Sequence, residues 1–119
     1  MAKTDHLGEF EQLALLAVMR LGEDAYGARI QEELDRTAAR EASISAIYIT
    51  LTRLEEKGMV RSWKALPTDE RGGRARRYFA VEPEGVVALD EARQRLLCMW
   101  DGLESALDAA AGSAGGDGT

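Results

Sequence analysis

A single predicted β-hairpin stands among segments with helical periodicity, and it limits the folds that the chain can adopt. Two strand-like runs, MVRSWKAL at 59–66 and RARRYFAV at 74–81, flank a polar turn that contains the Gly72–Gly73 pair. The two glycines give the backbone the freedom that a tight turn or a close approach to a partner requires. The chain is therefore predicted to be α+β and mostly α-helical.

Two helices are predicted at the start of the chain. The first covers about 10–21, and its apolar residues point around nearly the whole circumference, so one side can face the domain's own core and the other a second subunit. The second helix, AYGARIQEELDR, is expected to begin at Asp24 as its N-cap. Its apolar stripe consists of Tyr26, Ile30 and Leu34.

A third helix is predicted to begin at Ser43 or Ser45, either of which can cap it, and to end near Lys57. Its apolar face comprises Ile44, Ile47, Leu51 and Leu54. The opposite face comprises Ser45, Ile49, Thr52, Arg53 and Glu56, with Tyr48 at the border. Polar side chains on this outer face are available to a partner.

The last helix is predicted to run from Pro83 to about residue 111, with proline in the first turn where its missing N–H does no harm. Leucines recur along it every seven residues, which is typical of a short coiled-coil seam. We expect a dimerisation seam made of Leu89, Leu96, Met99, Leu103 and Leu107. The Gly-rich residues 112–119 are predicted to form a disordered tail.

The charge of the chain is unevenly distributed. The whole chain has a formal net charge of −6, yet residues 45–80 hold eight Lys and Arg against four Asp and Glu, a net of +4. The remainder holds seven basic and seventeen acidic residues, a net of −10. One face of the protein can therefore attract phosphate while the rest keeps it soluble.

Several function classes are disfavoured by composition. Cys98 and His6 are the only residues of their types, so one chain offers neither a Cys/His zinc site nor a disulfide. No Ser/His/Asp or Cys/His set converges, and no phosphate-cradling Gly-rich loop follows a strand, so we expect no enzyme and no cofactor. The chain lacks an apolar run long enough to cross a bilayer and lacks a secretory signal, so we expect a cytoplasmic protein.

The order helix, helix, helix, hairpin, helix is that of a winged helix-turn-helix domain, whose third helix enters a major groove while the hairpin, the wing, lies along an adjacent groove or the backbone. This order predicts a DNA-binding domain over 1–82 and a dimerisation helix over 83–111. Four arginines lie at or beside the predicted wing tip, where they can meet phosphates or a minor groove: Arg71, Arg74, Arg76 and Arg77.

The sequence resembles the PadR family of transcriptional regulators across nearly all of residues 7–97. The similarity is densest in LLAVMRLGEDAYGARIQEEL, ISAIYITLTRLEEKGMVRS and PTDERGGRARRYFAVEPEG. The resemblance implies a dimeric DNA-binding repressor whose C-terminal helix mediates dimerisation. A single C-terminal helix is similar to the short subfamily, some members of which bind flat aromatic drugs between the subunits.

The predicted DNA-binding residues come from the third helix and the wing. They are Ser45, Tyr48, Ile49, Thr52, Arg53, Arg74 and Arg76. Polar side chains can donate to phosphates or base edges, and an exposed Ile49 can meet a thymine methyl. Because strand residues alternate between faces, Arg74 and Arg76 share one face of the wing, while Arg77 points to the other face with Phe79.

Alternatives remain open at this stage. Trp100, with Leu96 and Met99, either lines a pocket that stacks on a planar aromatic ligand or only fills the dimer seam. The wing arginines either bind DNA or belong to a solvated hairpin paired with Asp69 and Glu70. The expected partners are double-stranded DNA with a two-fold related operator, a second copy of the chain and a planar aromatic inducer; the rival is a winged-helix protein–protein interaction module.

Overall fold

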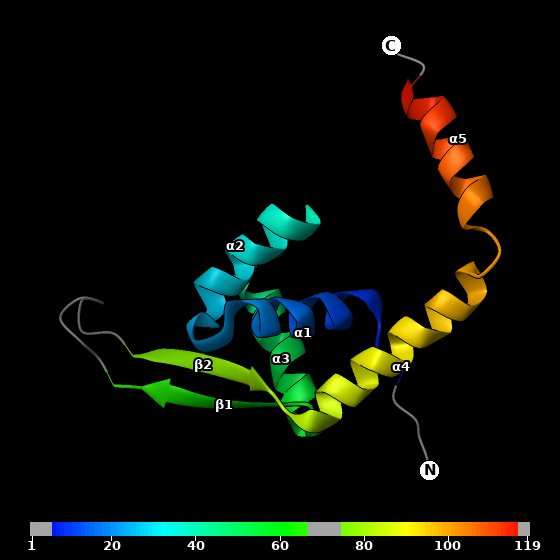
Figure 1. The fold of residues 1–119 in the computed structure, drawn as a ribbon. Coiled ribbons are helices and arrows are strands. Elements are labelled where there is room, and N and C mark those ends of the chain that lie inside the picture. The colour runs from blue at the N-terminus through cyan, green and yellow to red at the C-terminus, as the bar shows by residue number, and fades with distance from the viewer. Residues whose placement is uncertain (1–5, 67–74, 117–119) are drawn as a thin grey trace. The chain divides into compact units, whose positions relative to one another are not determined.

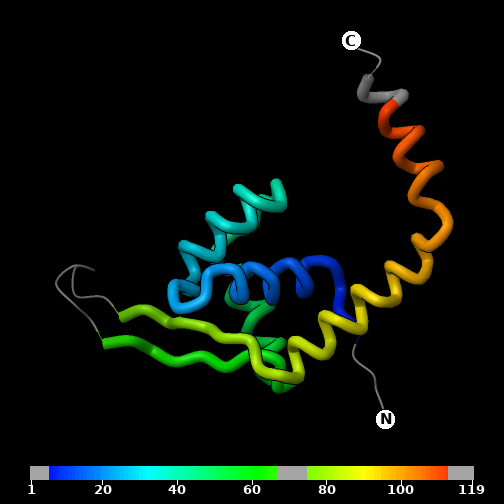
Figure 2. The backbone as a smooth tube through the Cα atoms, viewed as in Figure 1, coloured from blue at the N-terminus to red at the C-terminus, as the bar shows by residue number. Residues whose placement is uncertain are grey.

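The computed structural model describes residues 6–66 and 75–116 (Figures 1 and 2). The elements follow in the order α1 (Glu9–Leu21), a 3-10 turn η1 (Gly22–Asp24), α2 (Gly27–Ala38), α3 (Ile44–Glu56), β1 (Val60–Ala65), β2 (Arg76–Val81), α4 (Pro83–Trp100) and α5 (Glu104–Gly116). Contacts divide the chain into two compact units, Met1–Leu89 and Asp90–Thr119. The first unit contains α1, α2, α3, a two-stranded antiparallel sheet and the start of α4, so the predicted mostly helical α+β class is confirmed.

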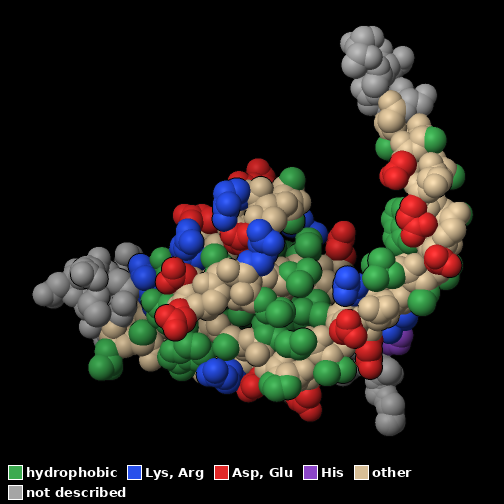
Figure 3. Space-filling model, viewed as in Figure 1, with side chains coloured by type: hydrophobic (Ala, Val, Ile, Leu, Met, Phe, Trp, Pro, Cys, Tyr) green, Lys and Arg blue, Asp and Glu red, His purple; other side chains and the backbone are tan. Residues whose placement is uncertain are grey.

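Helix α1 is apolar on more than one side, as its sequence indicates. Ala14, Leu15 and Val18 are buried in the core of the first unit, whereas Leu16 and Met19 are 44% and 48% exposed. Figure 3 shows hydrophobic side chains gathered on the surface in the middle of the view, where α1 lies. One side of this helix is therefore covered by its own chain, and the other is open.

The expected start of the second helix was wrong. Asp24 ends the 3-10 turn η1, and α2 begins only at Gly27, with an extended Tyr26 as its N-cap residue. The reason is a tertiary contact: the backbone N–H of Phe79 donates to the carbonyl of Ala25 at 2.9 Å, and Tyr26 forms a β-bridge with Tyr78. The edge of the hairpin therefore holds Tyr26 in an extended conformation.

Helix α3 has the predicted cap and faces. The hydroxyl of Ser43 accepts a hydrogen bond from the backbone N–H of Ala46 at 3.0 Å, and Gly58, with φ of +80°, follows the helix end. Ile47, Leu51 and Leu54 are fully buried. The apolar stripe of the sequence therefore faces the core as predicted.

Strands β1 and β2 pair antiparallel with Trp63 opposite Tyr78 and Lys64 opposite Arg77. Side chains alternate between the two faces of the pair. We call the face that carries Phe79 the inner face, because Phe79 is 1% exposed and belongs to the core cluster with α1, α2 and α3. We call the face that carries Trp63, Tyr78 and Arg76 the outer face.

The C-terminal segment was expected to be one helix from Pro83 to about residue 111, and this expectation of a single helix was wrong. Of the tail predicted over 112–119, residues 117–119 lie outside the described residues. The structure divides the segment into α4 and α5 at Gly102, whose φ of +86° lies in the left-handed region that favours glycine and interrupts an α-helix. Helix α5 continues to Gly116, past the predicted end at 111. None of the helices in the described part of the chain combines the length and apolar character needed to cross a bilayer.

Candidate nucleic-acid interface

The outer side of α3 carries side chains that the core does not use. Ser45, Thr52 and Arg53 are exposed, and Ile49 is 58% exposed although it is a large aliphatic residue. Hydroxyl and guanidinium groups can donate to phosphates and base edges, and an aliphatic side chain can contact a thymine methyl group. The helix therefore presents a surface with the chemistry of a recognition helix, formed by four of the residues predicted from sequence.

Tyr48 has a different place from these four. It is half-buried, and its ring lies 5.9 Å from the ring of Phe79, centroid to centroid. A methyl group at Gly27 would lie only 2.8 Å from the Tyr48 hydroxyl oxygen, so glycine allows the start of α2 to approach α3 closely. Tyr48 therefore packs between the helices and the sheet.

Arg76, the first residue of β2, is half-buried on the outer face of the wing. Its guanidinium carbon lies 3.9 Å from the centre of the Tyr26 ring, and Nη1 lies 3.4 Å from the Tyr78 hydroxyl oxygen, to which it donates. The hydrogen bond with Tyr78 raises the pKa of Arg76, and the negative charge of Asp24 acts in the same direction. This arginine is already in contact with protein groups, which the sequence did not indicate.

Aromatic rings continue this arrangement along the outer face. The ring of Tyr78 meets the ring of Tyr26 edge-on at 5.4 Å and stacks on that of Trp63 at 6.1 Å. The guanidinium of Arg61 lies 5.1 Å from the centre of the Trp63 ring. Cation–π and aromatic pairs of this kind stabilise surfaces beyond their buried area. The outer face thus joins the wing to the residue that precedes α2.

The inner face of the wing carries Arg77 and Lys64 beyond the core residue Phe79. Both side chains are exposed and stand directly opposite each other in the strand pair. Arg77 Nη1 donates to the hydroxyl of Ser62 at 2.7 Å, and that hydroxyl lies 2.9 Å from a carboxylate oxygen of Glu55 on α3, to which it donates. The alternation of strand residues predicted that Arg77 lies on the same face as Phe79. It did not predict that Lys64 lies opposite Arg77 on that face.

Two of the predicted wing residues cannot be placed. Arg71 and Arg74 lie outside the described residues, and so do Asp69 and Glu70, which the solvated-hairpin alternative pairs with the arginines. Of the four wing arginines, Arg76 and Arg77 have described positions.

A buried carboxylate fixes α1 against α2. Glu33 of α2 has a side chain only 5% exposed; it accepts from Nε of Arg20 at 2.8 Å, from Nη2 of Arg36 at 2.5 Å and from the hydroxyl of Thr37 at 2.6 Å. The hydrogen bonds from Thr37 and Arg20 lower the pKa of Glu33 to about 2. The hydrogen bonds and ion pairs that hold Glu33 between the two helices therefore require its ionised carboxylate.

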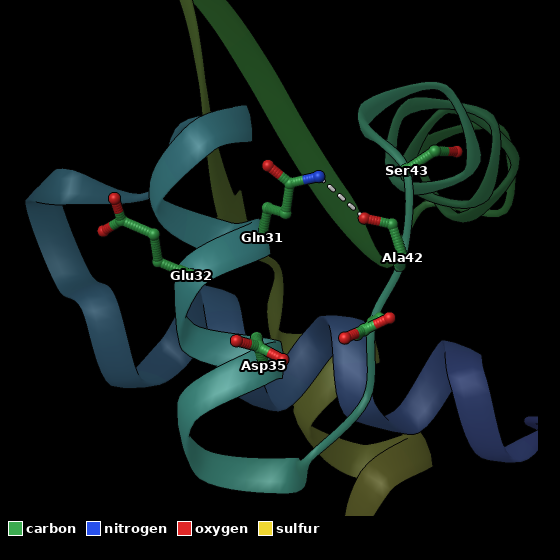
Figure 4. Close-up of a pocket in the computed structure, with 6 residues that line it drawn as sticks. Gln31, Glu32, Asp35, Ala42 and Ser43 are labelled. Atoms are coloured by element: carbon green, nitrogen blue, oxygen red, sulfur yellow. Dashed lines mark hydrogen bonds between the residues drawn. The ribbon is translucent and has the colours of Figure 1, made fainter.

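The hollow between α2 and the connector to α3 is acidic (Figure 4). It is lined by Gln31, Glu32, Asp35, Glu41, Ala42 and Ser43, and the Gln31 amide donates to the Ala42 carbonyl at 2.8 Å. Carboxylates repel phosphate, so this side of the helix pair does not suit a nucleic-acid backbone. Among the described residues, no group of three or more His, Cys, Asp or Glu side chains is placed to hold a metal ion.

Three helices, a paired wing and an exposed third helix define a winged helix-turn-helix protein of the class that regulates transcription. The chain belongs to the PadR-like family of transcriptional regulators, whose model matches residues 15–91. No curated protein sequence matches the chain.

Solved structures share the fold. A PadR family transcriptional regulator from Eggerthella lenta DSM 2243 is 25% identical with a TM-score of 0.63, and the match covers 83% of this chain and 86% of that one. A transcriptional regulator from Clostridium thermocellum is 18% identical with a TM-score of 0.63, covering 80% and 89% of the two chains. A PadR family regulator from Clostridium difficile R20291 is 20% identical with a TM-score of 0.60, covering 88% and 100%. The family and these structures are transcriptional regulators and not enzymes.

Proposed function

We propose that the protein is a homodimeric repressor that binds a two-fold related operator through α3 and the wing. Membership in the PadR-like family implies regulation through DNA binding. The observation that supports α3 as the recognition element is its exposed face, where Ile49, Thr52 and Arg53 have no role in the core. Repression follows because a dimer that occupies promoter DNA excludes the polymerase.

Dimerisation is supported by apolar side chains that remain exposed in the single chain. In the first unit these include Leu16 and Met19 of α1, while Leu89 packs against its own core. In the second unit, at least two-fifths of the accessible surface is exposed at Leu96, Met99, Trp100, Leu103 and Leu107. Exposed apolar side chains in such numbers are typical of an interaction site, and a second copy satisfies the two-fold symmetry of an operator.

Release by a planar aromatic ligand is the further part of this proposal. Trp100 ends α4 and is 45% exposed, so two symmetry-related indoles can stack on one flat ligand. The ligand releases the operator if it binds more tightly to a dimer whose recognition helices no longer match the half-site spacing. With Trp63 replaced by Phe, Trp100 is the only tryptophan of the chain. Saturable quenching of its emission by a planar aromatic cation supports the site, and no quenching at any concentration indicates packing alone.

The test of DNA binding is fluorescence anisotropy on labelled DNA from upstream of the protein's own gene and on scrambled DNA, over a salt series. The proposal expects tighter binding to the native DNA and a steep decrease of affinity with salt, since phosphate contacts release counterions. Equal affinity for both DNAs and for an unrelated polyanion contradicts sequence-specific regulation and favours the interaction-module alternative.

A further inference from the structure

The wing carries charge on both faces, and the two faces are built differently. On the outer face, Arg76 is engaged by the ring of Tyr26 at 3.9 Å and by the hydroxyl of Tyr78 at 3.4 Å. A guanidinium stacked in this way is held in one plane, with part of its donor capacity used. Arg76 therefore has less freedom to bind phosphate than an exposed arginine.

One partner of Arg76 lies outside the wing. Tyr26 is the N-cap residue of α2, fifty residues earlier in the chain, and it also bridges to Tyr78 through the backbone. The stack of Arg76 on Tyr26 thus connects the start of β2 to the start of α2. Loss of this contact frees the end of the hairpin nearest its turn, because Arg76 is the first paired residue of β2.

On the inner face, Arg77 and Lys64 form a pair of like charges. Directly opposite residues have Cβ atoms about 4.5–5.5 Å apart, and like charges at this separation are destabilising. In the described part of the chain, neither side chain makes a salt bridge. An anion between the two side chains removes this repulsion, and a DNA phosphate is an anion of suitable size and charge.

Arg77 is also oriented relative to the recognition helix. The Ser62 hydroxyl accepts from Arg77 and donates to Glu55 of α3, so a chain of hydrogen bonds runs from the wing to the helix. The inner face of the wing therefore turns toward α3, because Ser62 on this face contacts Glu55 of that helix. If α3 contacts DNA, Lys64 and Arg77 are the described wing cations on the same side.

We infer that Arg77 and Lys64 are the phosphate contacts of the wing, whereas Arg76 is a positioning residue that fixes the wing to α2 by stacking on Tyr26. This inference rests on the proposed function and assigns roles within that interface. It changes the expectation from sequence, in which Arg74 and Arg76 are the main DNA contacts of the wing and Arg77 points to the other face.

The test exchanges charge and shape separately at the two arginines. DNA affinity is measured by anisotropy over a salt series for four variants: Arg76→Lys, Arg76→Gln, Arg77→Lys and Arg77→Gln. At a phosphate contact only the charge is needed, so Arg77→Lys retains the wild-type slope of log K against log salt. Arg77→Gln reduces the steepness of that slope by about 0.9 for each protomer, or about 1.8 for the dimer. At a stacked site lysine does not replace arginine, so Arg76→Lys and Arg76→Gln weaken binding by a similar factor.

Two further variants complete the DNA series. Lys64→Gln is expected to lower the slope as Arg77→Gln does, and Arg61→Gln, which removes a charge from the outer face of the same hairpin, is expected to leave it unchanged. The inference is overturned if Arg76→Lys binds like the wild type while Arg76→Gln does not. It is equally overturned if Arg77→Gln keeps the wild-type slope.

A DNA-free measurement separates this inference from the proposed function. Urea denaturation of Arg76→Lys, Tyr26→Leu and the double variant gives the coupling between the two side chains. The stacking contact predicts that the double variant loses less stability than the two single losses together, and strict additivity contradicts the positioning role. If the wild type binds no DNA at any salt concentration, the proposed function fails together with the Arg77 contact, while the coupling still decides the role of Arg76.

Discussion

At the scale of single residues, Glu33 is the group whose charge matters most for the first unit. Burial opposes the ionised carboxylate, yet two arginines and a threonine donate to it. Such an arrangement stabilises the folded state only while the carboxylate is charged, because a protonated carboxyl accepts fewer hydrogen bonds and attracts no cation. The clamp between α1 and α2 is therefore sensitive to acid.

The sign of this pH dependence follows from the lowered pKa. Glu33 titrates near 2 in the folded protein and near 4.5 when unfolded, so its contribution is fully present above about pH 5 and is lost as the pH falls toward 2. Glu33→Gln is expected to lower the urea midpoint at pH 7, and the difference from wild type shrinks at pH 3. Glu32→Gln, at an exposed ion pair with Arg29, is the matched control and should change little. A difference that is the same at pH 7 and pH 3 contradicts the clamp.

At the scale of elements, periodicity predicted the helices better than their ends. The 3.6-residue spacing on α3 separated the buried Ile47 and Leu51 from the exposed Thr52 and Arg53, as the structure confirms. The prediction of where α2 begins was wrong because the β-bridge from Tyr26 to Tyr78 joins residues 52 positions apart. No local sequence pattern contains such a contact. The contact of Arg76 with the Tyr26 ring was missed for the same reason.

The close approach of α2 to α3 is a testable property of these elements. Gly27→Ala places a methyl group 2.8 Å from the Tyr48 hydroxyl, so we expect a loss of about 1–3 kcal/mol in unfolding free energy by urea denaturation. Adding Tyr48→Phe removes the hydroxyl and should restore part of that loss. Gly112→Ala in α5, where no atom lies within 4 Å of the new methyl group, is the control. Equal stability of Gly27→Ala and wild type argues against the close packing.

At the scale of the whole molecule, the exposed apolar residues of α1 and of the C-terminal helices lead to a prediction about assembly. Sedimentation at micromolar concentration should give twice the chain mass of 13.0 kDa. Met99→Asp, at a side chain that is 75% exposed in the single chain, should shift the equilibrium toward monomer because a charge is costly in an apolar interface. A stable wild-type monomer at this concentration contradicts the dimer.

The central claim, that α3 reads DNA, is tested most directly by the affinity of Arg53→Ala for upstream DNA in the anisotropy assay, with Arg61→Ala as the control. Arg53 is exposed on the outer side of α3, whereas Arg61 lies over Trp63 on the outer face of the wing. The account predicts that Arg53→Ala weakens specific binding by about 1–3 kcal/mol while Arg61→Ala remains close to wild type. An unchanged affinity in Arg53→Ala, or an equal loss in both variants, contradicts a recognition role for this face of α3.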